Sequence, residues 1–147
     1  MSQRILAVLD GGELSDPVLQ RALDLVLQSP GAVLRVVTAV ELPALLLAEG
    51  GLDDGRFEEQ SRDEGALLME EARTVARRRG VEIETAVLTC VDTDVADELV
   101  AEAGRWHADA IVVGAPRGGL RRLFRKNLAD HLAALTQLPV ERVSAAK

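Results

Sequence analysis

Four short runs of branched apolar residues divide this chain, and a helical pattern separates each run from the next. The runs are nearly continuous in apolar residues, whereas a strand with one solvent-facing side alternates apolar and polar residues. Continuous runs are typical of strands that are buried on both faces of a parallel sheet. The runs are Ile5–Leu9, Val33–Val40, Ile83–Leu88 and Ile111–Val113, and a weaker fifth run is Val140–Val143.

The segments between the runs space their apolar residues three and four positions apart, which gives a helix one apolar face. Because each crossover contains a helix, the strands are expected to be parallel and the crossovers right-handed. The sequence therefore predicts an α/β fold with helices on both faces of a parallel sheet. The four apolar faces are Leu19, Ala22, Leu23 and Val26; Gly65, Leu68, Met69, Ala72, Val75 and Ala76; Ala96, Leu99, Ala103 and Trp106; and Leu128, Leu132 and Leu135.

Capping residues agree with these helices. Ser15-Asp16-Pro17 predicts a helix N-cap followed by proline, Pro17, at the first helical position. Arg77–Arg79 places cations in a last helical turn, and Gly80 follows at the position that favours a left-handed conformation. Either Thr93 or Asp92 is expected to cap the third helix.

Length and charge limit the class of protein. The 147 residues suit one domain, 1–147, that is long enough to bury a core. Aromatic residues make up only 2% and the net charge is −7, which argues against a nucleic-acid binder. The lone Cys90 excludes an internal disulfide and suits a reducing cytoplasm. The chain runs directly into its first strand, so we expect no signal peptide, and the longest apolar run, Leu42–Ala48, is too short to span a membrane.

A long insert precedes the second helix. It consists of Leu42–Ala48 and the glycine-rich stretch Gly50–Gly55. Long loops of this kind are either lids over a binding site or variable surface loops, and both interpretations remain open.

Two glycine-containing loops follow strands that are expected to be neighbours. Asp10-Gly11-Gly12 follows the first strand and Gly114–Gly119 follows the fourth. Ligands of open parallel sheets bind at the carboxyl ends of the strands, at the point where the strand order reverses. The sequence therefore predicts a binding site between these two loops.

The second loop leads into a cluster of cations in an otherwise acidic protein. A cluster just before a helix start favours a phosphate or an acidic partner. The alternative is a short basic helix on the surface, whose arginine stems cover Leu123 and Phe124. Asn127 and Asp130 have the spacing of a capping box, in which Asn127 accepts a hydrogen bond from the Asp130 backbone N–H. The cluster consists of Arg117, Arg121, Arg122, Arg125 and Lys126.

Other reactive groups are few. Asp92, Asp94 and Asp97 resemble a hard-metal cluster, but acidic residues in a first helical turn more often interact with the helix dipole. His107 and His131 are isolated, and Cys90 is interpreted as a small core residue. No Walker A, G-x-G-x-x-G or G-x-S-x-G motif is present. The absence of a recognisable acid, base and nucleophile argues against an enzyme.

Several segments, in order and spacing, resemble the universal stress protein family over essentially the whole chain. The resemblance implies a Rossmann-like fold of the adenine nucleotide alpha hydrolase type, with a five-stranded sheet in the order 3-2-1-4-5. It also implies a homodimer and a stress-linked regulatory role. The matching segments are Ile5–Ser15 (ILAVLDGGELS), Leu34–Glu41 (LRVVTAVE), Ala108–Gly114 (ADAIVVG) and Leu138-Pro139-Val140.

Many members of that family bind ATP through a two-part motif. Its first part is G-x-x-G, and its second part, G-S/T, follows after nine further residues. Here Gly114 matches the first glycine, but the loop is one residue short and Arg117 stands where glycine is expected. Lys126 stands at the late glycine and Asn127 at the Ser/Thr position. The resemblance implies a degenerate nucleotide site. Its candidate ligands are ATP and magnesium, and we expect neither to be tightly bound. The implied site residues are Asp10, which matches the adenosine-side carboxylate, and Gly11, Gly12, Ala39, Val40, Gly114, Arg117, Gly118, Lys126 and Asn127.

Three functions remain open. The first is a non-enzymatic stress-response regulatory or interaction protein with a degenerate pocket and an unidentified protein partner. The second is an ATP-binding member, with slow hydrolysis, in which Lys126 and the arginines hold the phosphates. The third is an adenylate-forming enzyme, because Asp10–Ser15 weakly resembles the S-G-G-x-D-S loop.

The last strand bears on the expected homodimer. Antiparallel pairing of two last strands about a two-fold axis opposes Glu141 to Glu141, or Arg142 to Arg142. Charge on an edge strand also protects the edge against pairing. We therefore expect a homodimer that is weak if it uses this edge.

Overall fold

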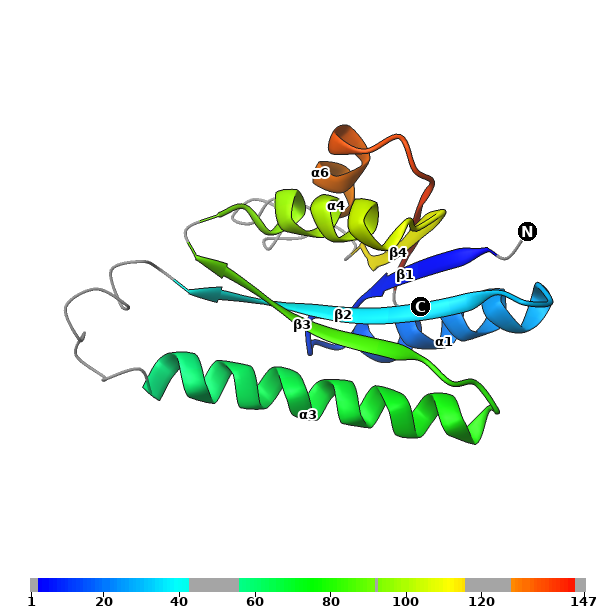
Figure 1. Ribbon diagram of the computed structural model, residues 1–147, viewed down its shortest axis with the longest axis horizontal. Coiled ribbons are helices and arrows are strands. Elements are labelled where there is room, and N and C mark those ends of the chain that lie inside the picture. Colours follow the sequence, from blue (N-terminus) through cyan, green and yellow to red (C-terminus); the bar gives the residue numbers. More distant parts are fainter. Residues whose placement is uncertain (1–2, 43–55, 92, 116–127, 145–147) are drawn as a thin grey trace.

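The computed structural model describes residues 3–42, 56–91, 93–115 and 128–144, and strands and helices alternate along them (Figure 1). The order confirms the alternation expected from the apolar runs. The elements are β1 (Arg4–Val8), α1 (Ser15–Gln28), β2 (Val33–Leu42), α3 (Arg56–Arg78), β3 (Glu84–Val91), α4 (Val95–Trp106), β4 (Ala110–Gly114), α6 (Leu128–Leu135) and β5 (Val140–Val143).

The five strands form one parallel sheet in the order β3-β2-β1-β4-β5, as predicted. The central strand β1 pairs with β2, where Ile5 lies opposite Leu34, and with β4, where Ile5 lies opposite Ala110. The outer pairs, β2 with β3 and β4 with β5, are also parallel. The strand order therefore reverses between β1 and β4.

Alternate residues of the buried strands feed two separate cores. Ile5, Ala7 and Leu9 pack on the face that α1 and α3 cover, whereas Leu6 and Val8 pack on the face of α4 and α6. Figure 1 shows these two helical layers below and above the sheet. Because both faces are covered, the central strands tolerate hardly any polar residue, which explains their continuous apolar runs.

The third strand departs from the expectation of burial on both faces. Most side chains of β3 are only partly buried, and Cys90 is the fully buried exception. The reason is its place in the sheet, because β3 is an edge strand with a neighbour on one side only. An apolar sequence predicts the strand but not its position in the sheet.

Two of the expected helix caps are wrong. Helix α1 begins at Ser15 itself, with Leu14 at the N-cap and no side-chain cap, so Pro17 lies at the third position rather than the first. The Ser15 hydroxyl is engaged in the preceding loop instead. The cap of α4 is neither Thr93 nor Asp92 but Asp94, whose carboxylate accepts a hydrogen bond from the Ala96 N–H at 2.8 Å.

The predicted glycine stop of α3 is confirmed. Gly80 has φ +77° and its N–H donates to the Arg77 carbonyl, while the Val81 N–H donates to the Ala76 carbonyl. Helix α4 ends with the same bonding pattern, but there the left-handed residue is His107, with φ 62°. A side chain at such a position is strained by its own Cβ.

A charged network closes the amino-terminal end of the sheet, opposite the predicted site. Arg35 of β2 donates to Glu102 of α4 at 2.8 Å and to Glu84 of β3 at 2.9 Å. Glu102, which is 6% exposed, also accepts from Arg105 at 2.8 Å. Burial alone would raise the pKa of the Glu102 carboxyl, but hydrogen bonds from Arg105 and Arg35 outweigh it and hold the pKa below its usual value. The network ties α4 to the sheet only while Glu102 is ionised.

We expect Glu102→Gln to destabilise the protein by about 2 kcal/mol at neutral pH, because charged hydrogen bonds to two arginines are replaced by weaker ones. The pKa of Glu102 is lower in the folded chain than in the unfolded chain, so its contribution is present above the unfolded pKa and is lost as the pH falls. The difference between wild type and variant should therefore shrink in acid. Urea unfolding at a series of pH values measures it, and a difference that stays constant down to acidic pH would contradict this account.

We expect His107→Gly to stabilise the protein by about 1 kcal/mol, because glycine adopts the left-handed conformation without strain. Gly80→Ala, at the equivalent position after α3, should destabilise it by a similar amount, since no atom lies within 4 Å of the added methyl group and only backbone strain acts. Urea unfolding at one fixed pH compares both variants with wild type. Equal stabilities for His107→Gly and wild type would show that the His107 backbone carries no strain.

Candidate functional site

The carboxyl ends of β2, β1 and β4 bring the described part of the predicted site together. Asp10, Gly11 and Gly12 follow β1, and Gly114 ends β4. The β1–β4 register pairs Ala7 with Val112, so the two loops leave the same end of the sheet, as predicted. In Figure 1 this is the end toward which the strand arrows point.

Strand β2 contributes apolar side chains to the carboxyl end of the sheet. Ala39 is partly buried and Val40 is 9% exposed, and both lie beyond Val37, which pairs with Val8 near the end of β1. Neither side chain offers a hydrogen-bond donor or acceptor. Ala39 and Val40 can therefore contribute contact area and backbone groups, but no charge.

The phosphate side of the predicted site lies outside the described residues. This applies to Arg117, Gly118, Lys126 and Asn127, and to Arg121, Arg122 and Arg125 of the basic cluster. It applies also to Gly50–Gly55 and to Leu42–Ala48 beyond the buried Leu42. The capping role expected for Asn127 therefore stays a prediction. The last described residue before this part of the site is Ala115, whose N–H donates to the Val143 carbonyl at 2.8 Å.

Hydrogen bonds fix the conformation of the loop after β1. The Asp10 Oδ1 accepts from the Gly12 N–H at 2.8 Å and from the Ser15 hydroxyl at 3.3 Å. The Ser15 Oγ in turn accepts from the Gly11 N–H at 2.8 Å. An aspartate that bonds the backbone two residues on forms an Asx turn. Ser15 therefore organises this loop, and this is the role that the cap prediction missed.

Glycine fits both loop positions better than a larger residue. Gly11 has φ +83°, which a larger residue adopts only with strain. A Cβ on Gly12 would lie 3.1 Å from the Asp10 Oδ1, close to the hydrogen bond that holds the turn. The turn presents Asp10 at the surface, and its Oδ2 accepts no hydrogen bond from any described residue. One carboxylate oxygen of Asp10 thus holds the loop.

Gly114 has a packing role that its sequence context did not reveal. A Cβ at this position would lie 3.0 Å from the Leu14 Cβ and 3.1 Å from its Cδ1. Leu14 is the N-cap of α1, so the start of this helix rests directly on the end of β4. Glycine at 114 therefore lets α1 approach the sheet, whatever ligand the loop beyond it binds.

Other titratable groups of the described chain do not assemble a reactive centre. Burial raises the pKa of the Cys90 thiol, with a further contribution from Glu98, so Cys90 is a poor nucleophile, in agreement with its predicted core role. Asp94 caps α4 and lies 3.5 Å from the His131 Nδ1, and Asp97 lies in the first turn. Among the described residues, no group of three histidine, cysteine or acidic side chains is placed to hold a metal ion.

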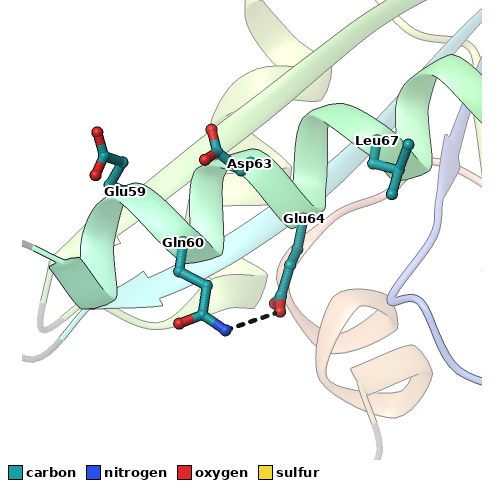
Figure 2. Close-up of a pocket in the computed structure, with 5 residues that line it drawn as sticks. All are labelled: Glu59, Gln60, Asp63, Glu64 and Leu67. Atoms are coloured by element: carbon teal, nitrogen blue, oxygen red, sulfur yellow. Dashed lines mark hydrogen bonds between the residues drawn. The ribbon is translucent and has the colours of Figure 1, made fainter.

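A pocket elsewhere on the surface is unsuited to a nucleotide. Its lining residues follow one another along α3, and Figure 2 shows the exposed Leu67 at one end of a row of three acidic side chains and Gln60. Within it, the Gln60 amide nitrogen lies 3.4 Å from a Glu64 carboxylate oxygen. Negative charge repels phosphate groups. The lining residues are Glu59, Gln60, Asp63, Glu64 and Leu67.

Comparisons with known proteins agree with this fold. The model of the universal stress protein family matches residues 1–143. A universal stress family protein from Burkholderia pseudomallei is 26% identical, with a TM-score of 0.76 over 97% of this chain and 96% of that protein. A universal stress protein from Archaeoglobus fulgidus in complex with dAMP is 20% identical, with a TM-score of 0.64 over 97% and 98% of the two chains.

A further universal stress protein, in complex with cAMP, is also 20% identical, with a TM-score of 0.74 over 98% of both chains. No curated protein sequence matches this chain significantly. Within the described ranges, no helix has the length and apolarity that crossing a membrane requires.

We expect Gly114→Ala to destabilise the protein by about 1–3 kcal/mol, because the new methyl group overlaps Leu14. Leu14→Gly removes the overlapping atoms, and glycine is acceptable at an N-cap. In the Leu14→Gly background, Gly114→Ala should therefore cost much less. Urea unfolding of the two single variants and the double variant measures this coupling, and strictly additive effects would show that Gly114 is not constrained by Leu14.

Proposed function

This chain belongs to the universal stress protein family, and we propose that it is a non-enzymatic regulatory or interaction protein of the stress response whose nucleotide pocket no longer binds ATP tightly. The proposal covers residues 1–147 as one domain acting in the cytoplasm through a second copy of itself and a further protein partner.

The replacement of glycine in the phosphate-binding motif carries this proposal. A phosphate-binding turn directs several backbone N–H groups at one anion and needs glycine where a Cβ would meet the phosphate. Here Arg117 and Lys126 stand at two such positions, and the loop after Gly114 is one residue short. A flexible ammonium group does not replace a fixed set of amide donors.

The adenosine side is better preserved than the phosphate side. The turn at Gly11 and Gly12 holds Asp10 at the carboxyl end of the central strand, with one carboxylate oxygen that accepts no hydrogen bond from a described residue. Solved relatives of the same fold are described in complex with dAMP and with cAMP, each of which carries a single phosphate. We therefore propose that any remaining affinity is for the nucleoside part and is weak.

The second candidate function is an ATP-binding protein with slow hydrolysis. The nucleotide complexes of the solved relatives favour it, as does the basic cluster, in which Lys126 and the arginines would supply positive charge to the phosphates. In this candidate function the cations replace the glycine amides as phosphate ligands, with magnesium bound by the phosphates.

We expect no ATP to remain bound through purification and no stoichiometric binding at micromolar ATP. The loss of two or three charge-assisted hydrogen bonds, at roughly 1.5–3 kcal/mol each, weakens binding by several orders of magnitude. Calorimetry with ATP and magnesium decides between the two functions, and titrations with dAMP and cAMP test the nucleoside side separately. A one-to-one isotherm with a low-micromolar Kd for ATP would establish the second function instead.

Two variants serve as controls for this measurement. Lys126→Gly alone should not create tight binding, because the loop after Gly114 stays short. Lys126→Gly combined with a one-residue insertion in that loop should improve ATP affinity. Thermal-shift measurements with ATP, with and without magnesium, are made on the wild type and on the same two variants.

A further inference from the structure

The outer side of α3 exposes one large apolar side chain to water. Leu67 is 61% exposed, more than any other large apolar residue of the described chain, and it belongs to neither core. The residues of α3 that face the sheet, such as Met69 and Ala72, are at most 4% exposed. A single exposed leucine is common on protein surfaces, so its surroundings decide whether it has a role.

Every near neighbour of Leu67 along the helix surface is acidic. The nearest side chains on a helix surface are those three and four positions away, about 5–6 Å apart between Cβ atoms. For Leu67 these are Asp63 and Glu64 on one side and Glu70 and Glu71 on the other, and all four are exposed. Figure 2 shows Asp63 and Glu64 on the turn next to Leu67. Leu67 and these four carboxylates are called the Leu67 patch below.

The carboxylates of the Leu67 patch have no cationic partner within the described chain. Glu64 accepts a hydrogen bond from the uncharged Gln60 at 3.4 Å, and no ion pair with a described residue involves the patch. Four negative charges therefore surround one apolar group, and the described residues do not neutralise them. The ion pairs of α3 in the described chain join other residues, Arg62 with Glu58 at 2.6 Å and Arg77 with Glu82 at 3.8 Å.

The spacing of the patch matches that of a second helix. Asp63 and Glu70 lie seven positions apart, as do Glu64 and Glu71, which corresponds to about 10.5 Å along the helix axis. A partner helix with lysine or arginine three and four positions on either side of an apolar residue has the same spacing. Its apolar residue would contact Leu67 while its cations lie opposite the carboxylates.

We propose that the Leu67 patch is the docking surface for a basic amphipathic helix of the protein partner. Contact with the partner removes Leu67 from water, and the four carboxylates select a partner with positive charges at the matching positions. The inference rests on the proposed function as an interaction protein, and it specifies the surface used and the chemistry of the partner.

The position of α3 allows a helix to approach it. The helix has 23 residues, a length of about 35 Å, and in Figure 1 it runs along the lower side of the molecule, below the sheet. The pocket of Figure 2 shares Leu67, Asp63 and Glu64 with the patch, so the surface is hollowed beside Leu67. An apolar side chain of the partner can lie in this hollow, against Leu67.

The charge of the patch argues against other classes of partner. Negative charge repels the phosphates of nucleic acids and the head groups of anionic lipids. A metal ion needs oxygen ligands that converge on one point, and among the described residues no three acidic side chains are placed in this way. Exposed ion pairs contribute little one by one, so the apolar contact with Leu67 is required as well.

Two synthetic peptides of equal composition test the spacing. Both are alanine-based helices of about 15 residues with acetylated and amidated ends and a central leucine. The matched peptide carries lysine three and four positions to each side of the leucine, and the control peptide carries lysine two and five positions away, on the opposite side of the helix. Calorimetry on the full chain at low salt should show about tenfold tighter binding of the matched peptide, and added salt should weaken it.

Matched leucine variants test the apolar contact. Leu67→Ala should weaken binding of the matched peptide about fivefold or more, because the buried apolar contact is lost. Leu27 of α1 is also exposed, at 52%, so Leu27→Ala serves as the control and should leave the Kd within about twofold. Thermal melts check that both variants are folded.

Matched charge variants test the carboxylates. Glu64→Gln with Glu71→Gln should weaken binding about tenfold and reduce its dependence on salt. Asp97→Asn with Glu82→Gln makes the same change in net charge at exposed positions outside α3 and should leave the Kd within about twofold.

Several outcomes would overturn the docking surface. Equal affinity for the two peptides, or equal losses with the two pairs of charge variants, would show general attraction between opposite charges. A one-to-one isotherm with calcium chloride alone that disappears in Glu64→Gln with Glu71→Gln would identify the patch as a metal site instead. Absence of peptide binding would overturn the patch and leave the proposed function standing, whereas a low-micromolar Kd for ATP would overturn the proposed function and leave the patch standing.

Discussion

The burial of β1 on both faces of the sheet is the constraint on which the rest of this structure depends. Ile5–Val8 are at most 6% exposed, so their backbone groups have no access to water and must bond to β2 and β4. The loops after β1 and β4 consequently leave the same end of the sheet. The site geometry, with Asp10 beside Gly114, follows from this pairing.

The same constraint explains which features of the fold are visible in the sequence. A strand buried on both faces must be apolar throughout, and a helix that covers it must carry apolar residues at helical spacing. The strands and most residues of the helix faces could therefore be predicted, including the buried Leu99 and Leu132. Leu135 of the fourth predicted face is an exception, because it is the last residue of α6 and is 42% exposed. Helix caps could not, because Thr93 and Asp94 are both suitable capping residues and the local sequence does not distinguish them, although Asp94 is the one used.

Contacts between residues far apart in the sequence could not be predicted, for a different reason. Arg35 and Glu102 lie 67 positions apart, and nothing in their local sequence marks them as partners. Gly114 resembled a phosphate-binding glycine, and the structure adds a contact with Leu14 that requires glycine for packing alone. Of the predicted site, the residues up to and including Gly114 are placed, whereas Arg117, Gly118, Lys126 and Asn127 lie outside the described residues and stay predictions.

The distribution of charge matters more for association than its sum. A net charge of −7 repels a second copy at long range, but physiological salt screens charges over about 8 Å. At contact distance, only the local pattern acts. On β5 the charges are satisfied within the chain by Arg21 and Asp130, so this edge gains little from a partner. On α3, by contrast, Glu59 and Arg73 have no ion pair with a described residue.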